Sequence, residues 1–379
     1  MASQNAGSGA QVKRSIPARV QCSGSLEMKE SSMYSGIGIY TAKDIEENEL
    51  IFSIKNPVLA VITNVEDGYK TACDNCFAAL FKELRTVTNP QLAFKACSAC
   101  KIAHYCSKQC QKAAWKHHHK HECQTYATSD IGDIIYVAPI RLLVRMLCLY
   151  TSNTIPKDLW NEFLSLPSEK KYRIEESRNA IKEIAQFMSG VTNLPQSLVV
   201  ETFSTVIHNQ RDIYLPTLRL HSKTDPLATG TMGFMGDCID PFASLIKHSC
   251  DGNTWLVFEG TELRCRAMRR IQAGTELTMS YIRPSTPSFI ERREKLRQTW
   301  NIDCKCSLCQ YPSPEPLGDL KKQLTRYNTH PKEGITFTNQ QPTLDEIQKD
   351  IEQMKAAGFG AATLPMLALH RLALWAHLS

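Results

Sequence analysis

The hydrophobic residues follow two different periods along the chain, one typical of helices and one typical of strands. Across residues 131–200 apolar side chains recur three or four positions apart, which predicts helices built on positions such as Ile181, Ile184, Phe187 and Met188. The most apolar stretch there, residues 134–150, is shorter than the ~20 residues that cross a bilayer, so it predicts a buried amphipathic helix. Residues 274–281 alternate instead, which predicts an acidic turn that enters a strand.

The remaining segments carry weaker patterns. Residues 1–17 are rich in Ser, Gly, Ala and Gln, which is typical of a disordered tail. Residues 216–240, with their Thr, Gly, Met and Asp, predict a long loop. After residue 312 the helical period returns: Pro365 is well placed to begin one helix, and the apolar face of an earlier helix would hold Leu344, Ile347, Ile351 and Met354.

Composition sets the broad class of protein. The chain has 379 residues, of which 42% are hydrophobic, so it can form two or three ordinary globular domains. Its formal charge of +6 is mild and its basic residues are spread, so nucleic-acid binding is permitted but not indicated. The residues before Val20 have no apolar core and therefore predict no secretory signal. We expect a protein of the cytoplasm, the nucleus or both, without membrane contact.

The densest chemistry lies between Cys73 and Cys123. Two Cys-x-x-Cys pairs are followed by two pairs with an offset of four residues, and pairs of both kinds can place two ligands on one Zn²⁺ ion. The four-residue offset would put both members of a pair on one helix face. Buried structural cysteines and disulfides are the alternatives, and a reducing compartment disfavours the disulfides. Eight ligands make two sites: Cys73, Cys76, Cys97, Cys100, Cys106, Cys110, His119 and Cys123.

These intervals, with a Tyr before the third pair and Trp115 before the last ligands, closely resemble the MYND-type zinc finger. In that family the two sites interleave. The resemblance therefore implies one site of Cys73, Cys76, Cys106 and Cys110 and another of Cys97, Cys100, His119 and Cys123. Three other histidines crowd the last turn, and only the three-residue gap before Cys123 favours His119 over His117, His118 and His121.

A second cysteine cluster, Cys304-x-Cys306-x-x-Cys309, is one ligand short of a tetrahedron. The missing thiolate must come from elsewhere, and Cys250 in the segment 247–253 offers it. This segment and the strand 274–281 resemble the SET domain of protein lysine methyltransferases, in which two such segments thread through one another. The resemblance implies a third, post-SET zinc site and a binding site for S-adenosylmethionine.

The beginning of the same domain would lie far upstream. Residues 35–40 hold Gly36-x-Gly38, a pattern that is more often an ordinary turn but that here resembles the SET hairpin that approaches the cofactor. A SET domain split by a MYND finger is typical of the SET-and-MYND family, and the four motifs follow in its order. The resemblance implies an α+β fold, mostly β in the SET domain. The expected parts are 18–70 and 201–284 for SET, 71–124 for the finger, 125–200 for a helical insert, 285–312 for the post-SET site and 313–379 for C-terminal helices.

Methyl transfer to lysine needs a neutral amine, and only about one lysine in 10³ is neutral at pH 7. The resemblance makes Tyr281 the catalytic residue, whose hydroxyl orients the amine, although an isolated tyrosine is more often a core residue. Trp300 would line the lysine channel, although a Trp there is more often simple packing. The resemblance assigns cofactor binding to Gly36, Ile37, Gly38, Asn209, Lys247, His248, Tyr281 and Ile302.

Three positions depart from the family pattern. Lys247 replaces an asparagine, and its ammonium is repelled by the positive methyl donor unless it contacts the donor's carboxylate. Ile302 replaces an aromatic residue, which keeps apolar contact but loses stacking on the adenine. Gly252 replaces a common proline, which changes loop stiffness more than chemistry.

The chain is therefore expected to be an S-adenosylmethionine-dependent protein-lysine methyltransferase that holds three Zn²⁺ ions and acts on proteins such as histones. The alternative is an interaction scaffold with a weak or inactive SET core, whose finger recruits partner proteins, as the family often does through proline-rich peptides. A third interpretation, nucleic-acid binding through the basic run 112–120, is disfavoured because such a helix face is usually only solvated.

Overall fold

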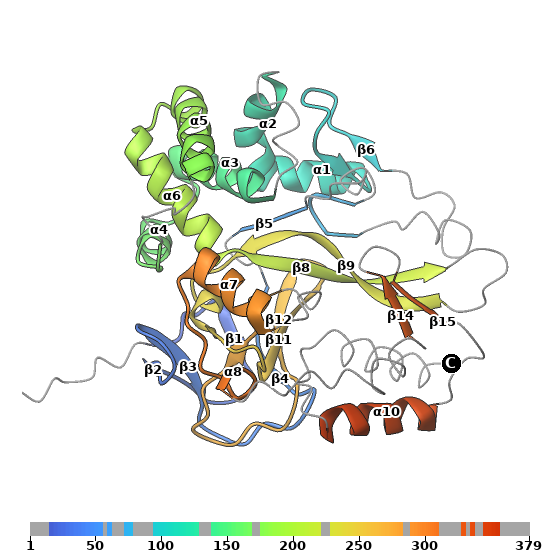
Figure 1. Ribbon diagram of the computed structural model, residues 1–379. Helices are drawn as coiled ribbons and strands as arrows, with labels where there is room; N and C mark the ends of the chain where they lie inside the picture. The colour runs from blue at the N-terminus through green and yellow to red at the C-terminus, as the bar shows by residue number, and fades with distance from the viewer. Residues whose placement is uncertain are drawn as a thin grey trace, which may run out of the picture.

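The α+β class expected from the sequence is confirmed. The protein is seen in a computed structural model, in which helices α1–α6 lie along one side and most of the strands lie beneath them (Figure 1). The structure describes residues 15–55, 59–62, 72–78, 94–128, 138–168, 175–220, 228–282, 289–310, 327–330, 334–337 and 344–356.

Strands from before and after the finger form one unit. The main sheet has the order β1-β4-β12-β11, and its central pair joins β4 from before the finger to β12 from after it. An isolated bridge between Tyr40 and Glu276 ties the two halves together again. The bounds of the strands are β1 (Val20–Cys22), β2 (Leu26–Glu30), β3 (Ile37–Thr41), β4 (Leu50–Ile54), β11 (Thr254–Glu259) and β12 (Glu262–Ala267).

The core of this unit follows the alternation of the strands. Leu263 is fully buried because β12 sends alternate side chains to one face, whereas β3 and β4 are buried on both faces, so Ile39, Phe52 and Ile54 lie deep in the core. Two short strands, β10 (Lys247–His248) and β13 (Thr278–Met279), then pair in parallel. This pairing threads the two SET-like segments past each other, as the sequence implied.

The prediction of a long loop at residues 216–240 is wrong. Strands β8 (Arg211–Leu220) and β9 (Ala228–Ile239) pair antiparallel there, and β5 (Leu59–Ile62) pairs with the other edge of β9 (Figure 1). The Gly and Thr residues of this segment are common in loops, and its composition does not reveal the strands with which it pairs. Strand propensity depends on those neighbours more than on the strand itself.

The finger is built from β6 (Lys95–Ala96), β7 (His104–Tyr105), α1 (Lys108–Ala114), a π-helical turn (Trp115–His119) and α2 (Lys120–Ala127). The prediction that Cys106 and Cys110 share a helix face is wrong. Ser107 caps α1 and accepts a hydrogen bond of 3.1 Å from the Cys110 amide, so the helix begins after Cys106. His119 and Cys123 do lie on one continuous helical segment.

Four helices follow the finger: α3 (Ala138–Thr151), α4 (Lys157–Leu164), α5 (Glu175–Thr192) and α6 (Gln196–Asn209). The apolar period predicted them, and Ile181 and Met188 of α5 are buried as expected. One apolar cluster joins these helices to the finger through residues such as Tyr105, Tyr126, Leu142 and Phe163. The finger and the helical insert thus share one hydrophobic core.

The post-SET part begins with α7 (Phe289–Trp300), which ends where Asn301 adopts a left-handed φ of 54°, a common helix C-terminus. The short helix α8 (Ser307–Gln310) then carries the last cysteine.

The C-terminal region holds α10 (Leu344–Ala356), as the period predicted. It is not wholly helical, however, because β14 (Tyr327–His330) and β15 (Gly334–Phe337) pair within it. Residues 1–14 of the expected tail, which was predicted over 1–17, and the expected helix that begins at Pro365 lie outside the described residues. Within the described part of the chain, no helix combines the length and apolarity that a membrane span requires.

Candidate metal centres and active site

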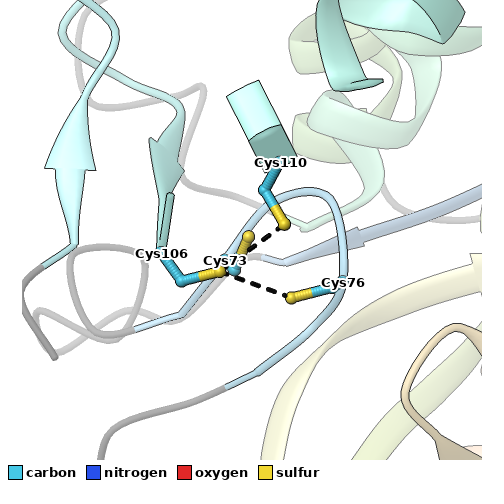
Figure 2. A group of neighbouring side chains, drawn as sticks. All are labelled: Cys73, Cys76, Cys106 and Cys110. Atoms are coloured by element: carbon cyan, nitrogen blue, oxygen red, sulfur yellow. Dashed lines mark hydrogen bonds between the residues drawn. The ribbon is translucent and has the colours of Figure 1, made fainter. Parts of the chain in front are cut away.

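The first cysteine group gathers four sulfurs around one point (Figure 2). The Sγ of Cys106 lies 3.7 Å from that of Cys76 and 3.5 Å from that of Cys110, and Cys73 completes the group. A tetrahedron with Zn–S bonds of about 2.3 Å has edges of about 3.8 Å, whereas a disulfide would bring two sulfurs to about 2.0 Å. All fifteen cysteines of the chain are free, so the spacing suits a metal ion and not a bridge.

The second group consists of Cys97, Cys100, His119 and Cys123, all buried. The Nε2 atom of His119 lies 3.7 Å from the Sγ of Cys100, and Cys97 and Cys123 are 3.8 Å apart through their sulfurs. The other ring nitrogen of His119 faces Glu122 at 3.4 Å, an arrangement that orients a metal-binding imidazole.

Among the crowded histidines, only His119 lies with the three cysteines. His118 instead faces Asp74, while His117 and His121 lie on the outer side of the helix. The gap of three residues before Cys123 was therefore a sufficient guide to the position of the histidine.

The third group joins Cys250 to Cys304, Cys306 and Cys309. The Sγ of Cys250 is 3.5 Å from that of Cys309 and 3.9 Å from that of Cys304, although more than fifty positions separate them in the sequence. The protein therefore has zinc-binding cysteine clusters in both the finger and the post-SET region.

A buried charge network lies between the finger and α3, and sequence reasoning missed it. Arg145 contacts both Asp74 and Glu122 at 2.8 Å, and Arg141 contacts the other oxygen of Asp74 at 2.8 Å. Burial alone would raise the pKa of the Asp74 carboxyl, but the two guanidiniums hold it well below its ordinary value. Asp74, Glu122 and His118 also lie close enough to hold a cation, but the arginines already neutralise the two carboxylates.

This network could have been suspected from one signal. Arg141 and Arg145 are four positions apart in an otherwise apolar helix, so they share a face that must find partners if it is buried. Both arginines are buried, at 2% and 4% exposed, so this face of the helix does need partners.

The candidate active site is centred on Tyr281, which follows β13. Its hydroxyl donates a hydrogen bond of 2.6 Å to the main-chain oxygen of Ile246, and its ring lies 5.2 Å from His248 and 5.5 Å from Trp300. Burial raises the pKa of the Tyr281 hydroxyl above its ordinary value, so the group stays protonated near neutrality.

His248 connects this tyrosine to the post-SET cluster. Its Nδ1 accepts a hydrogen bond of 3.0 Å from the main-chain N–H of Tyr281, so the neutral ring carries its proton on Nε2. That Nε2 lies 3.3 Å from the Sγ of Cys250. The zinc cluster thereby fixes the backbone that presents Tyr281.

The Gly-x-Gly turn lies beside two buried charges. A β-carbon at Gly36, whose φ is +88°, would be 3.6 Å from the Nζ of Lys247, and one at Gly38 would collide with the carboxylate of Glu276. Burial lowers the pKa of Lys247 below its ordinary value, while the nearby Glu276 opposes that shift. Gly36 therefore suits glycine because of its left-handed φ, and Gly38 because a β-carbon would meet the carboxylate of Glu276.

Only one of the two carboxylate oxygens of Glu276 accepts hydrogen bonds from the described residues. Its Oε2 accepts hydrogen bonds from the Ser32 amide at 2.9 Å, the Ser32 hydroxyl at 2.7 Å and the Tyr40 hydroxyl at 2.9 Å. Its Oε1 is buried and has no hydrogen-bond partner among the described residues. A buried carboxylate oxygen without a donor is costly unless a ligand supplies one.

The other expected cofactor residues lie around this centre with differing contacts. Ile302 packs into the post-SET cluster, and Ile37 begins β3 next to the two glycines. Asn209 ends α6, where its amide group donates to the main-chain oxygens of Pro167 at 2.7 Å and Thr205 at 2.9 Å. The donors of Asn209 are thus already engaged within the protein.

Gly252 has a packing role that the sequence did not reveal. A β-carbon there would lie 2.7 Å from the main chain of Met279 in β13, so a proline would force the two strands apart. The departure from the family pattern at this position therefore also involves close packing, besides the change in loop stiffness that we expected.

Comparison with known proteins agrees with these sites. A family model described as "MYND finger" matches residues 73–123, and one described as "SET domain" matches residues 147–282. Histone-lysine N-methyltransferase SMYD3 of Mus musculus is 28% identical over 334 residues, which cover 85% of this chain and 66% of that protein. Histone-lysine N-methyltransferase ASHR1 of Arabidopsis thaliana is 29% identical over 284 residues, which cover 72% and 53%.

The chain spans between about half and two thirds of the length of these relatives. Among solved structures, the SET domain of LSMT bound to lysine and AdoHcy aligns at 14% identity with a TM-score of 0.38, covering 96% of this chain and 72% of that one. A likeness at that score is too slight to support an argument.

The matches and the geometry agree on the order of the parts. The MYND finger lies between β4 and β12, two strands that pair in one sheet, and the SET match continues to Ile282. The chain thus matches a MYND finger and a SET domain, and it is similar to proteins of the SET-and-MYND type.

Proposed function

We propose that this protein is an S-adenosylmethionine-dependent protein-lysine N-methyltransferase. The observation that carries the proposal is the position of Tyr281, whose ring is walled by His248 and Trp300 and held by the post-SET cluster. The names of its relatives as histone-lysine N-methyltransferases support the same reaction. Proteins such as histones would be the substrates, in the cytoplasm, the nucleus or both.

The residues beside the Gly-x-Gly turn fit the amino-acid end of the cofactor. That end carries an ammonium and a carboxylate. The free Oε1 of Glu276 can accept from the ammonium, and the Nζ of Lys247 can donate to the carboxylate. Gly36 and Gly38 leave the backbone open to close approach at the same place.

When bound, S-adenosylmethionine would supply an electrophilic methyl group. The protein must present a lysine amine in its neutral form, and the buried surroundings of Tyr281 favour that form because desolvation penalises an ammonium. The Tyr281 hydroxyl already donates to Ile246, so its oxygen remains able to accept a hydrogen bond from the amine and orient its lone pair.

The zinc ions would be structural. We assign one ion to Cys73, Cys76, Cys106 and Cys110, a second to Cys97, Cys100, His119 and Cys123, and a third to Cys250, Cys304, Cys306 and Cys309. Each group has four ligands and no open position, which is the pattern of a structural site and not of a catalytic one.

A second role is favoured by one feature of the finger. Trp115 is 49% exposed although it stands beside the ring of His119, and an exposed indole is a common anchor for partner proteins. The finger would recruit proline-rich peptides, either to bring substrates to the SET core or, in a scaffold, in place of catalysis.

The test is transfer of a tritiated methyl group from S-adenosylmethionine to core histones and to an undermethylated cell extract. We expect label in protein that survives acid hydrolysis as methyl-lysine, and a rate of labelling about 10² to 10³ lower with the Tyr281→Phe variant. If purified, zinc-loaded wild-type protein labels neither substrate, the proposed activity is wrong and the scaffold remains.

A further inference from the structure

Arg211 is the first residue of β8 and is 7% exposed. Its guanidinium carbon lies 4.1 Å from the centre of the Tyr281 ring. One terminal nitrogen donates to the main-chain oxygen of Gln210 at 2.9 Å, and the Nε has no hydrogen-bond partner in the part of the chain that the structure describes. The side chain is thus a buried cation stacked on the proposed catalytic residue.

The two cations beside Tyr281 are not held in ion pairs with the described residues, although the acidic residues Asp212 and Asp237 lie nearby on β8 and β9. Arg211 and Lys247 are both buried, and neither forms an ion pair with a carboxylate of the described residues. Glu276 is the acidic group that acts on both Lys247 and Tyr281, but it is hydrogen-bonded to Ser32 and Tyr40. A buried guanidinium without an acidic partner is costly, so the site is prepared for an anion.

A substrate lysine competes with this arrangement. A substrate lysine arrives as an ammonium, before it loses its proton in the buried site, and ammonium and guanidinium groups are both attracted to the face of a tyrosine ring. Two cations cannot share that face, and Lys247 adds to the repulsion. The guanidinium must be drawn aside before the amine can reach the hydroxyl of Tyr281.

We propose that Arg211 is a specificity-determining residue, and that the acceptor is a lysine flanked by acidic residues. A carboxylate beside the acceptor lysine pairs with the guanidinium of Arg211, draws it from the ring of Tyr281 and leaves that face to the amine. This proposal rests on the proposed methyltransferase function. It selects acidic protein segments over the basic sequences that surround most histone-tail lysines.

Pairing across the site would act on both binding and rate. The carboxylate accepts charge-assisted hydrogen bonds from the guanidinium of Arg211, whose Nε has no other partner among the described residues. An uncharged flank gains nothing and leaves the guanidinium in place. We therefore expect kcat/KM for an acid-flanked peptide to exceed that for a neutral peptide by about tenfold.

The test compares two peptides that differ only in flanks of Glu or Gln around one lysine. Their kcat/KM values are measured with wild-type protein, with Arg211→Met, and with Arg270→Met as the control, because Arg270 is exposed and pairs at the surface with Asp44. We expect Arg211→Met to abolish the preference and to speed transfer to the neutral peptide, while Arg270→Met keeps the wild-type preference. An unchanged preference in Arg211→Met would overturn the proposal.

A binding measurement separates this inference from the proposed activity. The same peptides, with norleucine in place of lysine and a fluorescent label, are titrated with each variant and followed by anisotropy. Tighter binding of the Glu-flanked peptide that disappears in Arg211→Met supports the role of Arg211 even if no methyl transfer is found. Equal binding of both peptides to the wild type contradicts it even if the protein methylates lysine.

Discussion

Two buried charge clusters in this molecule are built in opposite ways. Between the finger and α3, two arginines meet two carboxylates at 2.8 Å, and every charge has a partner within the protein. Around Tyr281, Arg211 and Lys247 have no ion-pair partner among the described residues, and one oxygen of Glu276 is unused. The first cluster holds two parts of the fold together, and the second holds charges that a ligand can complete.

The largest effect should follow removal of zinc. We expect about three zinc ions per chain, and structural zinc contributes ~10 to 16 kcal/mol to the folding of small finger peptides, so a strong chelator should unfold the finger. Elemental analysis checks the count. Cys250→Ser should lose one ion and keep the two of the finger, whereas Cys22→Ser, outside all three groups, should keep all three.

Those zinc counts bear on the ligand groups directly. Loss of finger zinc in Cys250→Ser would show that the grouping is wrong, and a wild-type content of one ion or none would remove the metal assignment.

The charge network between the finger and α3 can be broken by Arg145→Met, which removes a buried ion-pair partner from both Asp74 and Glu122. Removing one member of a buried ion pair costs about 3 to 5 kcal/mol, measured as a loss of free energy of unfolding in denaturant with zinc present. Arg270→Met breaks an exposed, solvent-screened pair and should lower the free energy of unfolding far less. Similar losses in the two variants would mean that the buried network does not join the finger to α3.

In the site around Tyr281, Tyr281→Phe should lower the rate of methyl transfer by a factor of about 10² to 10³. This is the usual cost of removing one positioned hydrogen-bonding group from an active site. The ring stays in place against His248 and Trp300, so cofactor affinity should change little. Single-turnover rates and binding titrations separate the two quantities. A variant as fast as the wild type would remove Tyr281 from the chemistry.

The smallest effect is expected from Lys247→Asn, which restores the family residue. If the Lys247 ammonium pairs with the carboxylate of the cofactor, its loss should weaken binding by about tenfold, both for S-adenosylmethionine and for its product, which lacks the sulfonium charge. A gain in affinity confined to S-adenosylmethionine would instead mean that repulsion between the two cations dominates.

The two clusters also differ from the zinc sites in how far the sequence could predict them. Most zinc ligands stand at short, regular intervals, so spacing alone predicted that Cys73 and Cys76 share one ion and that Cys304 and Cys309 share another. The group at 304–309 lacked a fourth ligand, and this shortage pointed to Cys250. Arg211 carries no such mark, because its contact with Tyr281 arises from the pairing of β8 with β9 and from a fold that brings distant segments together. Much of the β8–β9 pair was predicted as a loop, at 216–240, and Arg211 lies just before that range, where the sequence carried no sign of a strand pair.

The central claim is that the SET core binds S-adenosylmethionine at the residues around Tyr281. Calorimetric titration of the zinc-loaded protein tests it without knowledge of the substrate. We predict one molecule bound per chain, with affinity retained in Tyr281→Phe and lowered in Glu276→Gln, whose free oxygen we assign to the cofactor ammonium. The absence of any binding heat up to millimolar cofactor would contradict the claim and leave the protein as a zinc-bound scaffold.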